Sequence, residues 1–156
     1  KIAAPMVRYS KLPFRALCRK YGCDLIYTPM IVAKDFNASR FARDSEFTTN
    51  ESDRPLIVQF AASDAEELAS AAEKVAKYCD GVDINCGCPQ KWVIKEGIGS
   101  ALLSRDPQVV ADMVKLTKDR SGLPVSIKIR IDTDMRKTIE LVQRAEKMGC
   151  TWVTVH

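Results

Sequence analysis

The segment of this sequence best suited to chemistry is a tight turn that carries two cysteines. Residues 85–90 read Asn-Cys-Gly-Cys-Pro-Gln and follow an apolar run, so a strand would lead directly into the turn. Gly87 permits close approach of the backbone, and Pro89 fixes the direction in which the chain leaves. A thiol with an ordinary pKa of about 8.5 is mostly protonated at neutral pH. Because no histidine is near in the sequence, the turn favours a thiol that gives a proton over a Cys–His nucleophile. A buried structural cysteine is the alternative.

A second signal comes from polar residues at the ends of apolar runs. Side chains two apart on a strand share a face, so Ser126, Lys128 and Arg130 would point one way and the apolar residues between them the other way. A parallel strand buried on both faces should be apolar throughout, and this one is not. Similar polar residues end other runs: Gln59, Asp83, Asn85, Thr154 and His156. Because active sites lie at the C-terminal ends of parallel strands, we expect these residues to converge on one ligand. For each residue alone, a satisfied buried polar group is the alternative.

Short apolar runs alternate with amphipathic stretches, which is typical of repeated βα units around a parallel sheet. We expect strands at residues 2–6, 24–28, 56–60, 82–85, 125–131 and 152–156. Six strands fit either an open doubly wound sheet or an incomplete eight-stranded barrel, whose usual length is about 250 residues. Length alone favours the open sheet.

Three helices between these strands have readable ends. A capping-box pattern, Ser63 with Glu66, begins the first helix. The second helix begins at Asp106, since the proline that follows is tolerated at the first helical position. The third covers about residues 134–148 and stops at Gly149.

The composition excludes several classes of protein. With 46% hydrophobic and 28% charged residues, the 156-residue chain has enough apolar material for a core, so general disorder is excluded. No apolar run approaches the roughly 20 residues of a membrane span, and no secretory signal is visible. The cytoplasm is the expected compartment, with the nucleus as a second one. The six cysteines are expected to be reduced thiols, and without paired zinc-site spacing no metal site is expected. A net charge of +4 permits a nucleic-acid partner without requiring one.

Several motifs together resemble the tRNA-dihydrouridine synthase family along essentially the whole chain. The combination of Asn-x-Gly-Cys-Pro with Lys-Ile-Arg and a strand ending in Val-His is highly specific. The matching segments are residues 4–7, 27–30, 43–47, 55–59, 83–89, 97–103, 125–130 and 153–156. The Asp-Ile-Asn-Cys-Gly-Cys-Pro-Gln and Tyr-Thr-Pro-Met segments most resemble the eukaryotic branch that acts on positions 20a and 20b of the tRNA D-loop.

This resemblance implies a TIM (β/α)8 barrel that binds FMN, followed by a helical tRNA-binding domain. Residues 1–156 would be the N-terminal part of the catalytic barrel, with about its first six strands, and the last barrel strands and the helical domain would lie outside the chain. The implied reaction is ping-pong: NADPH reduces FMN, then hydride passes to C6 of an extruded uracil while Cys88 protonates C5. Extrusion is required because the reacting carbons are otherwise stacked. The resemblance therefore favours the barrel over the open sheet.

The resemblance also implies roles for individual residues. Cys88, rather than Cys86, would be the proton donor, and Asn85 and Arg130 would lie beside the target base or the flavin. The residues implied to hold FMN are Pro5, Met6, Val7, Gln59, Lys128 and His156. A cation at Lys128 would stabilise the anionic reduced flavin at its pyrimidine edge.

Two groups of residues are possible tRNA contacts. Trp92 stands where some bacterial members have lysine, and it would either stack on a base or pack within the protein. The basic residues expected to touch phosphates, if they are not simply solvated, are Arg8, Lys11, Arg15, Arg19, Lys91 and Lys95. The glycine-rich segment 96–103 lacks the Lys-Ser of a phosphate loop and is expected to form part of the substrate loops.

Two other functions remain open at the level of sequence. One is reduction of a free pyrimidine by an FMN barrel resembling dihydroorotate dehydrogenase. The other is a non-catalytic RNA-binding or interaction fragment, whose exposed strand edges would pair with another chain.

Overall fold

The computed structural model describes residues 1–156, and its central feature is one parallel sheet. Six strands follow one another across the sheet in chain order, and a short seventh strand also pairs with β4. The strands are β1 (Ile2–Ala3), β2 (Leu25–Tyr27), β3 (Ile31–Val32), β4 (Leu56–Ala61), β5 (Gly81–Cys86), β6 (Val125–Ile129) and β7 (Trp152–Val155). A doubly wound sheet reverses its strand order at a switch point. This sheet never reverses, so it is part of a barrel, and the expectation of a barrel is confirmed.

A hydrogen bond across the concave side of the sheet confirms its curvature. The indole Nε1 of Trp152 in β7 donates to the hydroxyl of Tyr27 in β2 at 2.9 Å. In a flat sheet these strands would lie four spacings apart, roughly 19 Å at about 4.8 Å each. The sheet must therefore bend so that β2 and β7 face each other, as the strands of a half-barrel do.

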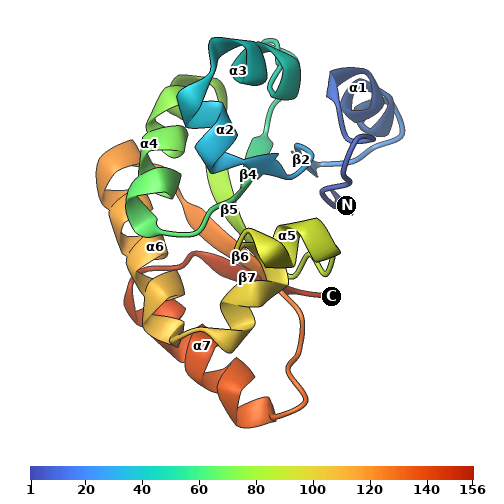
Figure 1. Cartoon of the computed structure of the whole chain (residues 1–156). Coiled ribbons are helices and arrows are strands. Elements are labelled where there is room, and N and C mark those ends of the chain that lie inside the picture. The colour runs from blue at the N-terminus through green and yellow to red at the C-terminus, as the bar shows by residue number, and fades with distance from the viewer.

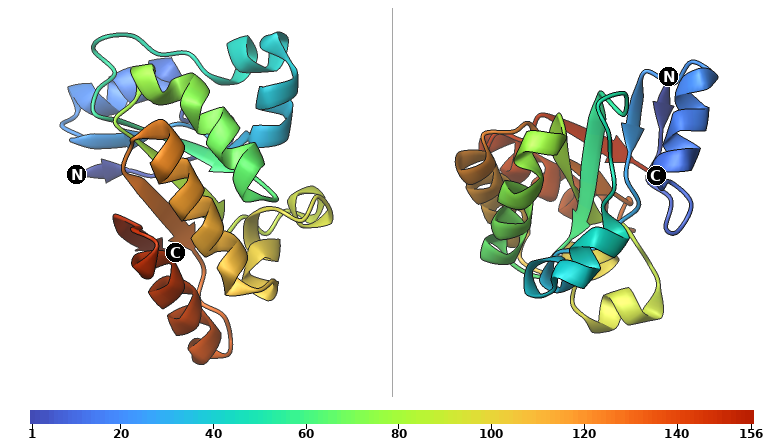
Figure 2. Two further views of the ribbon diagram at one scale, coloured as in Figure 1. Left: turned by 90° about the vertical axis from the view of Figure 1, so that its left-hand side faces the viewer. Right: turned by 90° about the horizontal axis from the view of Figure 1, so that it is seen from above.

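Helices cover the convex side of the sheet. Figure 1 shows α4, α6 and α7 packed side by side there, and Figure 2 shows the same arrangement from two further directions. The helices are α1 (Leu12–Lys20), α2 (Ala33–Ala38), α3 (Arg40–Glu46), α4 (Ala65–Val75), α5 (Lys91–Lys95), α6 (Pro107–Ser121) and α7 (Met135–Lys147), with 3-10 helices η1 (Ala76–Tyr78) and η2 (Gly99–Ser104). None of these helices is both long and apolar enough to cross a membrane.

The core lies between the sheet and the outer helices, and alternation along the strands separates it from the polar interior. Val58, Ile84 and Ile127 are fully buried against α4 and α6, which contribute residues such as Leu68 and Met113. Burial of each such side chain contributes about 1.5–3 kcal/mol relative to exposure. The alternate residues of the same strands are Gln59, Asp83, Asn85, Ser126 and Lys128, and they face the barrel interior. The expected separation of faces is confirmed.

Several predicted boundaries need correction. Asp64, not Ser63, caps α4, since its carboxylate accepts a hydrogen bond from the backbone N–H of Glu67 at 2.9 Å. A carboxylate caps as well as a hydroxyl and is favoured by the positive end of the helix dipole. The first strand ends at Ala3 rather than residue 6, because Pro5 has no N–H for the ladder. The ends of α6 and α7 are confirmed, with Asp106 and Asp134 as their caps.

Candidate active site

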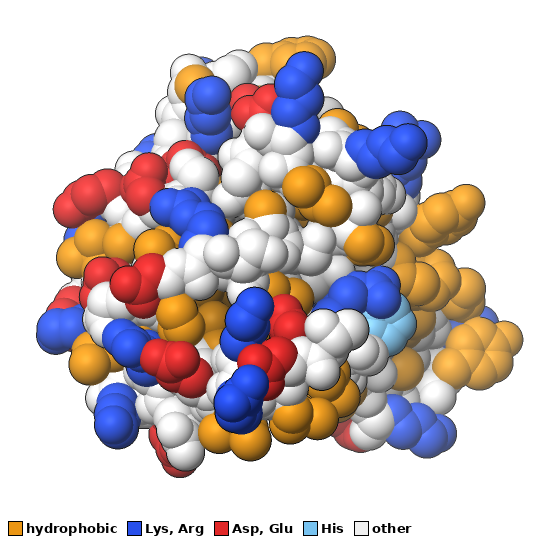
Figure 3. All heavy atoms as spheres, turned by 60° about the horizontal axis from the view of Figure 1, so that its bottom comes forward, with side chains coloured by type: hydrophobic (Ala, Val, Ile, Leu, Met, Phe, Trp, Pro, Cys, Tyr) orange, Lys and Arg blue, Asp and Glu red, His pale blue; other side chains and the backbone are white.

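A pocket of about 150 Å³ opens where the C-terminal ends of the strands meet. It brings together the residues that the resemblance implied for catalysis, FMN and substrate, except Met6: Pro5, Val7, Gln59, Asn85, Cys88, Lys128, Arg130 and His156. Asp83 and Thr154, which were also expected to converge on the ligand, do not line the pocket. Met30, Gly87 and Pro89 complete the lining and were not predicted. Met6 lies outside the lining, although its neighbours on both sides belong to it. Figure 3 shows the chain's one histidine on the surface beside basic side chains.

The turn that carries Cys88 is held by hydrogen bonds from three directions. The side-chain oxygen of Asn85 accepts from the backbone N–H groups of Gly87 at 3.1 Å and Cys88 at 2.9 Å. Arg130 Nε donates to the carbonyl of Gly87 at 2.8 Å. The N–H of Ser100 donates to the carbonyl of Cys88 at 3.0 Å. The turn is therefore pre-organised, and it presents the Cys88 side chain to the pocket.

The two cysteines of the turn have different environments. Cys86 is fully buried on the helix-facing side of β5, and burial raises the pKa of its thiol. Cys88 is partly exposed and lines the pocket. Of the two thiols, only that of Cys88 is open to a ligand in this pocket. No group of three or more His, Cys, Asp and Glu side chains is placed to hold a metal ion.

Charged and polar side chains of the barrel interior lie in and behind the pocket, and hydrogen bonds join several of them. Gln59 Nε2 and Ser126 Oγ donate to the two carboxylate oxygens of Asp83, at 2.7 Å and 2.5 Å. Burial raises the pKa of Asp83 to about 6, although these hydrogen bonds and the charge of Lys128 act in the opposite direction. Burial also lowers the pKa of Lys128, which the charge of Asp83 opposes. The pocket thus contains a half-buried cation supported by a buried carboxylate.

The prediction that Arg15 touches tRNA is wrong. Its side chain is only 2% exposed, and its guanidinium donates to Asp53 from Nε at 2.9 Å and from Nη2 at 2.7 Å. Two more of the basic residues in that prediction make hydrogen bonds within the protein: Lys11 donates to the carboxylate of Glu46, and Arg19 donates to the carbonyl of Pro55. A buried guanidinium must be paired, so Arg15 of α1 stabilises the fold through Asp53. The other basic residues of the prediction are exposed: Arg8, Lys91 and Lys95.

A groove of about 300 Å³ adjoins the pocket and shares Val7 and Met30 with it. Trp92 forms part of its wall and is 48% exposed. The indole Nε1 of Trp92 donates to Gln90 Oε1 at 2.6 Å, which holds the ring at the edge of the groove. Trp92 is therefore about half exposed at the wall of the groove beside the pocket.

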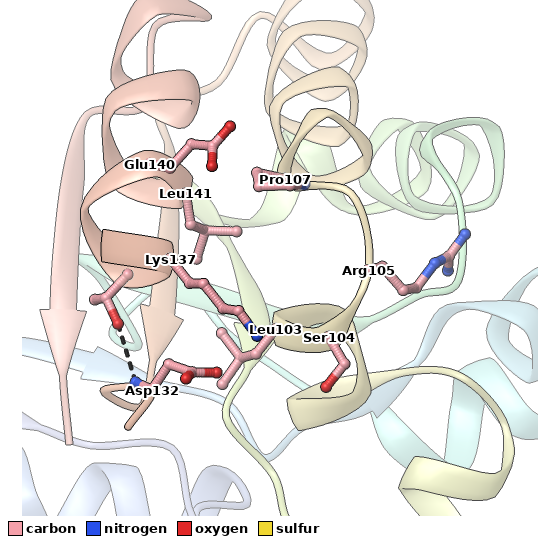
Figure 4. A pocket seen from close by; sticks show the side chains of 9 residues that line it. Leu103, Ser104, Arg105, Pro107, Asp132, Lys137, Glu140 and Leu141 are labelled. Carbon is pink, nitrogen blue, oxygen red and sulfur yellow. Dashed lines mark hydrogen bonds between the residues drawn. The ribbon is translucent and has the colours of Figure 1, made fainter. Parts of the chain in front are cut away.

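Another pocket, of about 200 Å³, lies between η2 and α7 and contains no predicted site residue. Figure 4 shows Lys137 reaching across it toward Leu103 and Ser104. Its charges are mixed, since Asp132 and Glu140 line it together with Lys137 and Arg105. The Nη1 of Arg105 already donates to the carbonyl of Ser63 at 2.7 Å. We therefore take the pocket at the strand ends as the candidate site.

Comparison with known proteins shows the family to which the chain is similar. The model of the dihydrouridine synthase (Dus) family matches residues 2–156. A Homo sapiens protein named as an NAD(P)+ tRNA-dihydrouridine(20a/20b) synthase-like protein is 58% identical over 100% of this chain and 50% of its own length. A Schizosaccharomyces pombe NAD(P)+ tRNA-dihydrouridine(20a/20b) synthase is 51% identical over 99% of this chain and 48% of its own length. A Rattus norvegicus protein named for positions 16/17 is 39% identical over 99% of this chain and 36% of its own length.

The chain spans about half the length of the curated relatives that it matches at 51–58% identity. Among solved structures, a truncated 3-deoxy-D-arabino-heptulosonate 7-phosphate synthase from Thermotoga maritima superposes with a TM-score of 0.51. The match covers 99% of this chain and 48% of that one at 14% sequence identity. At such low identity the likeness concerns the fold alone.

Proposed function

The chain belongs to the dihydrouridine synthase family, and from this membership we propose that the protein of which it forms part reduces uridine in tRNA to dihydrouridine with electrons from NADPH. The observation that carries the proposal is the pocket that gathers Cys88, Gln59, Lys128 and Arg130 at the strand ends. The D-loop positions 20a and 20b are the proposed targets. Relatives named for those positions are 46–58% identical to the chain, whereas those named for positions 16/17 are 37–39% identical.

FMN is the cofactor that we propose for this pocket. Its lining combines apolar side chains, Val7 and Met30, with the Gln59 amide and the Lys128 ammonium. A flavin ring needs this combination, because it has apolar faces and a polar pyrimidine edge. Burial limits the solvation of Lys128, so its charge would stabilise negative charge on the reduced ring. When bound, FMN would take electrons from NADPH and supply the hydride that reaches C6 of uracil.

The size of the pocket indicates how much of the cofactor these residues hold. Its volume of about 150 Å³ is smaller than the roughly 300–1,000 Å³ of typical cofactor sites. We therefore assign the residues of this chain to one end of the flavin. The last barrel strands and a helical tRNA-binding domain, which we place in the remainder of the protein, would supply the other contacts.

Cys88 is the proposed proton donor to C5 of the uracil ring. The turn holds its side chain at the pocket, and the thiol needs no base to act as an acid. Proton transfer leaves a thiolate, which the positive charges of Arg130 and Lys128 in the same lining would stabilise. Asn85 uses its amide mainly on the turn and on Gln59, so its contact with substrate would be limited to the remaining N–H.

The test is a comparison of the whole natural protein with its Cys88→Ala and Cys86→Ala variants. Dihydrouridine would be measured in unmodified tRNA with NADPH, and bound flavin by its visible absorption. We expect Cys88→Ala to keep its flavin and to lose activity by at least about 100-fold, the usual contribution of a general acid. Cys86→Ala is the control and should remain active.

Two results would count against this proposal. A fully active Cys88→Ala variant would remove the thiol from the reaction. A wild-type protein that binds no flavin and modifies no tRNA would favour the non-catalytic interaction fragment.

A further inference from the structure

A chain of hydrogen bonds leads from the buried carboxylate of Asp83 to the turn that carries Cys88. Gln59 Nε2 donates to Asp83 Oδ2 at 2.7 Å, and Asn85 Nδ2 donates to Gln59 Oε1 at 3.0 Å. Asn85 Oδ1 then accepts from the backbone N–H groups of Gly87 and Cys88 at 3.1 Å and 2.9 Å. Two amide side chains thus connect a residue behind the pocket with the backbone of the proposed proton donor.

In this series of hydrogen bonds, the orientation of each side-chain amide is determined by its partners at both ends. An ionised carboxylate only accepts hydrogen bonds, so Gln59 must turn its NH2 group toward Asp83. Its carbonyl oxygen then faces the NH2 group of Asn85. The carbonyl oxygen of Asn85 is left for the turn, where the two backbone N–H groups can only donate. No amide can flip without breaking a bond at each of its ends.

Burial makes this order costly to disturb. Asp83 is 0% exposed and Gln59 is 1% exposed. Water therefore cannot replace a lost partner, and a buried polar atom without one is strongly disfavoured. Ser126 Oγ satisfies the second carboxylate oxygen at 2.5 Å without taking part in the connection to the turn. Because the pKa of Asp83 is about 6, the group is mostly ionised at neutral pH and can act as the acceptor.

We propose that Asp83 is a positioning residue, which acts through Gln59 and Asn85 to fix the turn that presents Cys88 to the pocket. Asp83 does not line the pocket, so its effect on the position of the turn would pass through these two side chains. The inference deepens the proposed function and rests on it for the role of Cys88. The hydrogen-bond chain itself can be tested without tRNA or NADPH.

The first experiment is hydrogen exchange, followed by mass spectrometry, on the whole natural protein and its Asp83→Ala and Ser126→Ala variants. Asp83→Ala removes both hydrogen bonds of the carboxylate, including the one that leads to the turn, whereas Ser126→Ala removes only the bond outside that connection. We expect exchange in the peptide covering residues 86–90 to accelerate about fivefold in Asp83→Ala, the population change from losing one net hydrogen bond. In Ser126→Ala the same peptide should stay within about twofold of wild type. Equal acceleration in both variants would overturn the proposal.

A second set of variants keeps the proposal testable if Asp83→Ala does not fold. Gln59→Glu places two carboxylates face to face and should loosen the turn. Adding Asp83→Asn restores an N–H donor between positions 83 and 59, while the new carboxylate still accepts from Asn85. We expect the double variant to return exchange in residues 86–90 to within about twofold of wild type, the non-additive behaviour of coupled neighbours.

A double variant that exchanges as fast as Gln59→Glu alone would show that Asp83 does not act through Gln59. Because the readout is the backbone of the turn, this failure is separate from failure of the proposed function. If Cys88→Ala loses dihydrouridine formation and the double variant still exchanges as fast as Gln59→Glu alone, the proposed function stands. Only the role of Asp83 is then refuted.

Discussion

A methyl group added at Gly99 should displace Cys88, whereas the same group at Gly97 should not. Both glycines have a left-handed backbone, with φ of +63° at Gly99 and +72° at Gly97. A Cβ at Gly99 would lie 2.9 Å from the carbonyl oxygen of Cys88, 3.2 Å from its Cβ and 2.5 Å from Cγ1 of Val93. A Cβ at Gly97 would meet no atom within 4 Å. Gly97→Ala is therefore a matched control for backbone strain alone.

The magnitudes follow from these contacts. Either alanine would hold a left-handed conformation that costs about 1–2 kcal/mol. Gly99→Ala would also overpack the space beside Cys88, which adds about 1–3 kcal/mol and moves the turn. A displacement of about 1 Å at a reacting group can lower a rate about 100-fold. We expect Gly99→Ala to lose at least about tenfold in dihydrouridine formation and Gly97→Ala to stay within about threefold.

The assay combines urea denaturation with the initial rate of dihydrouridine formation by the whole natural protein. The free energy of unfolding should fall in both variants, and the rate should fall strongly only in Gly99→Ala. Equal stability and equal rate in the two variants would contradict the prediction, because they would show that a side chain at position 99 does not displace Cys88.

Three further predictions concern other parts of the molecule. Asp53→Ala leaves the Arg15 guanidinium buried without its partner, so urea denaturation should show a loss of about 3–5 kcal/mol; a loss below about 1 kcal/mol would contradict the buried pair. The folded pKa of Asp83, about 6, lies above its ordinary value of 3.8, so ionisation of Asp83 disfavours the folded state. As pH rises from about 4 to 7, the free energy of unfolding of wild type should therefore fall relative to Asp83→Asn by up to about 3 kcal/mol. If the free energy of unfolding changed with pH in the same way in wild type and Asp83→Asn, burial would not raise the pKa of the Asp83 carboxyl. Trp92→Ala should weaken tRNA binding by about 1–3 kcal/mol if a base stacks on the ring, with Trp92→Phe losing less; unchanged binding in a filter assay would mean that the ring only packs.

Local patterns predicted the polar face of the strands and most of the pocket. Alternation along residues 125–130 separated Lys128 and Arg130 from the core, because side chains on a strand alternate strictly between two faces. The turn at Cys88 was equally readable, since glycine and proline restrict the backbone in known ways. The strand order that distinguishes a barrel from an open sheet depends on non-local pairing, and only the family resemblance indicated it.

Residues whose partners are distant in sequence could not be assigned. The hydrogen bond between Tyr27 and Trp152 joins positions 125 residues apart. Arg15 was predicted to contact tRNA because nothing in the sequence marks Asp53 as its buried partner. Asp83 was recognised as a polar residue at a strand end, but its place behind Gln59 depends on the register between β4 and β5.

The central claim is that Cys88 delivers the proton that completes reduction of the uracil ring. The most direct measurement mixes unmodified tRNA with natural protein already reduced by NADPH, and follows the first equivalent of dihydrouridine with time. We predict that Cys88→Ala forms it at least about 100-fold more slowly than wild type, while Cys86→Ala keeps the wild-type rate. A Cys88→Ala variant that forms dihydrouridine as fast as wild type would contradict the assignment.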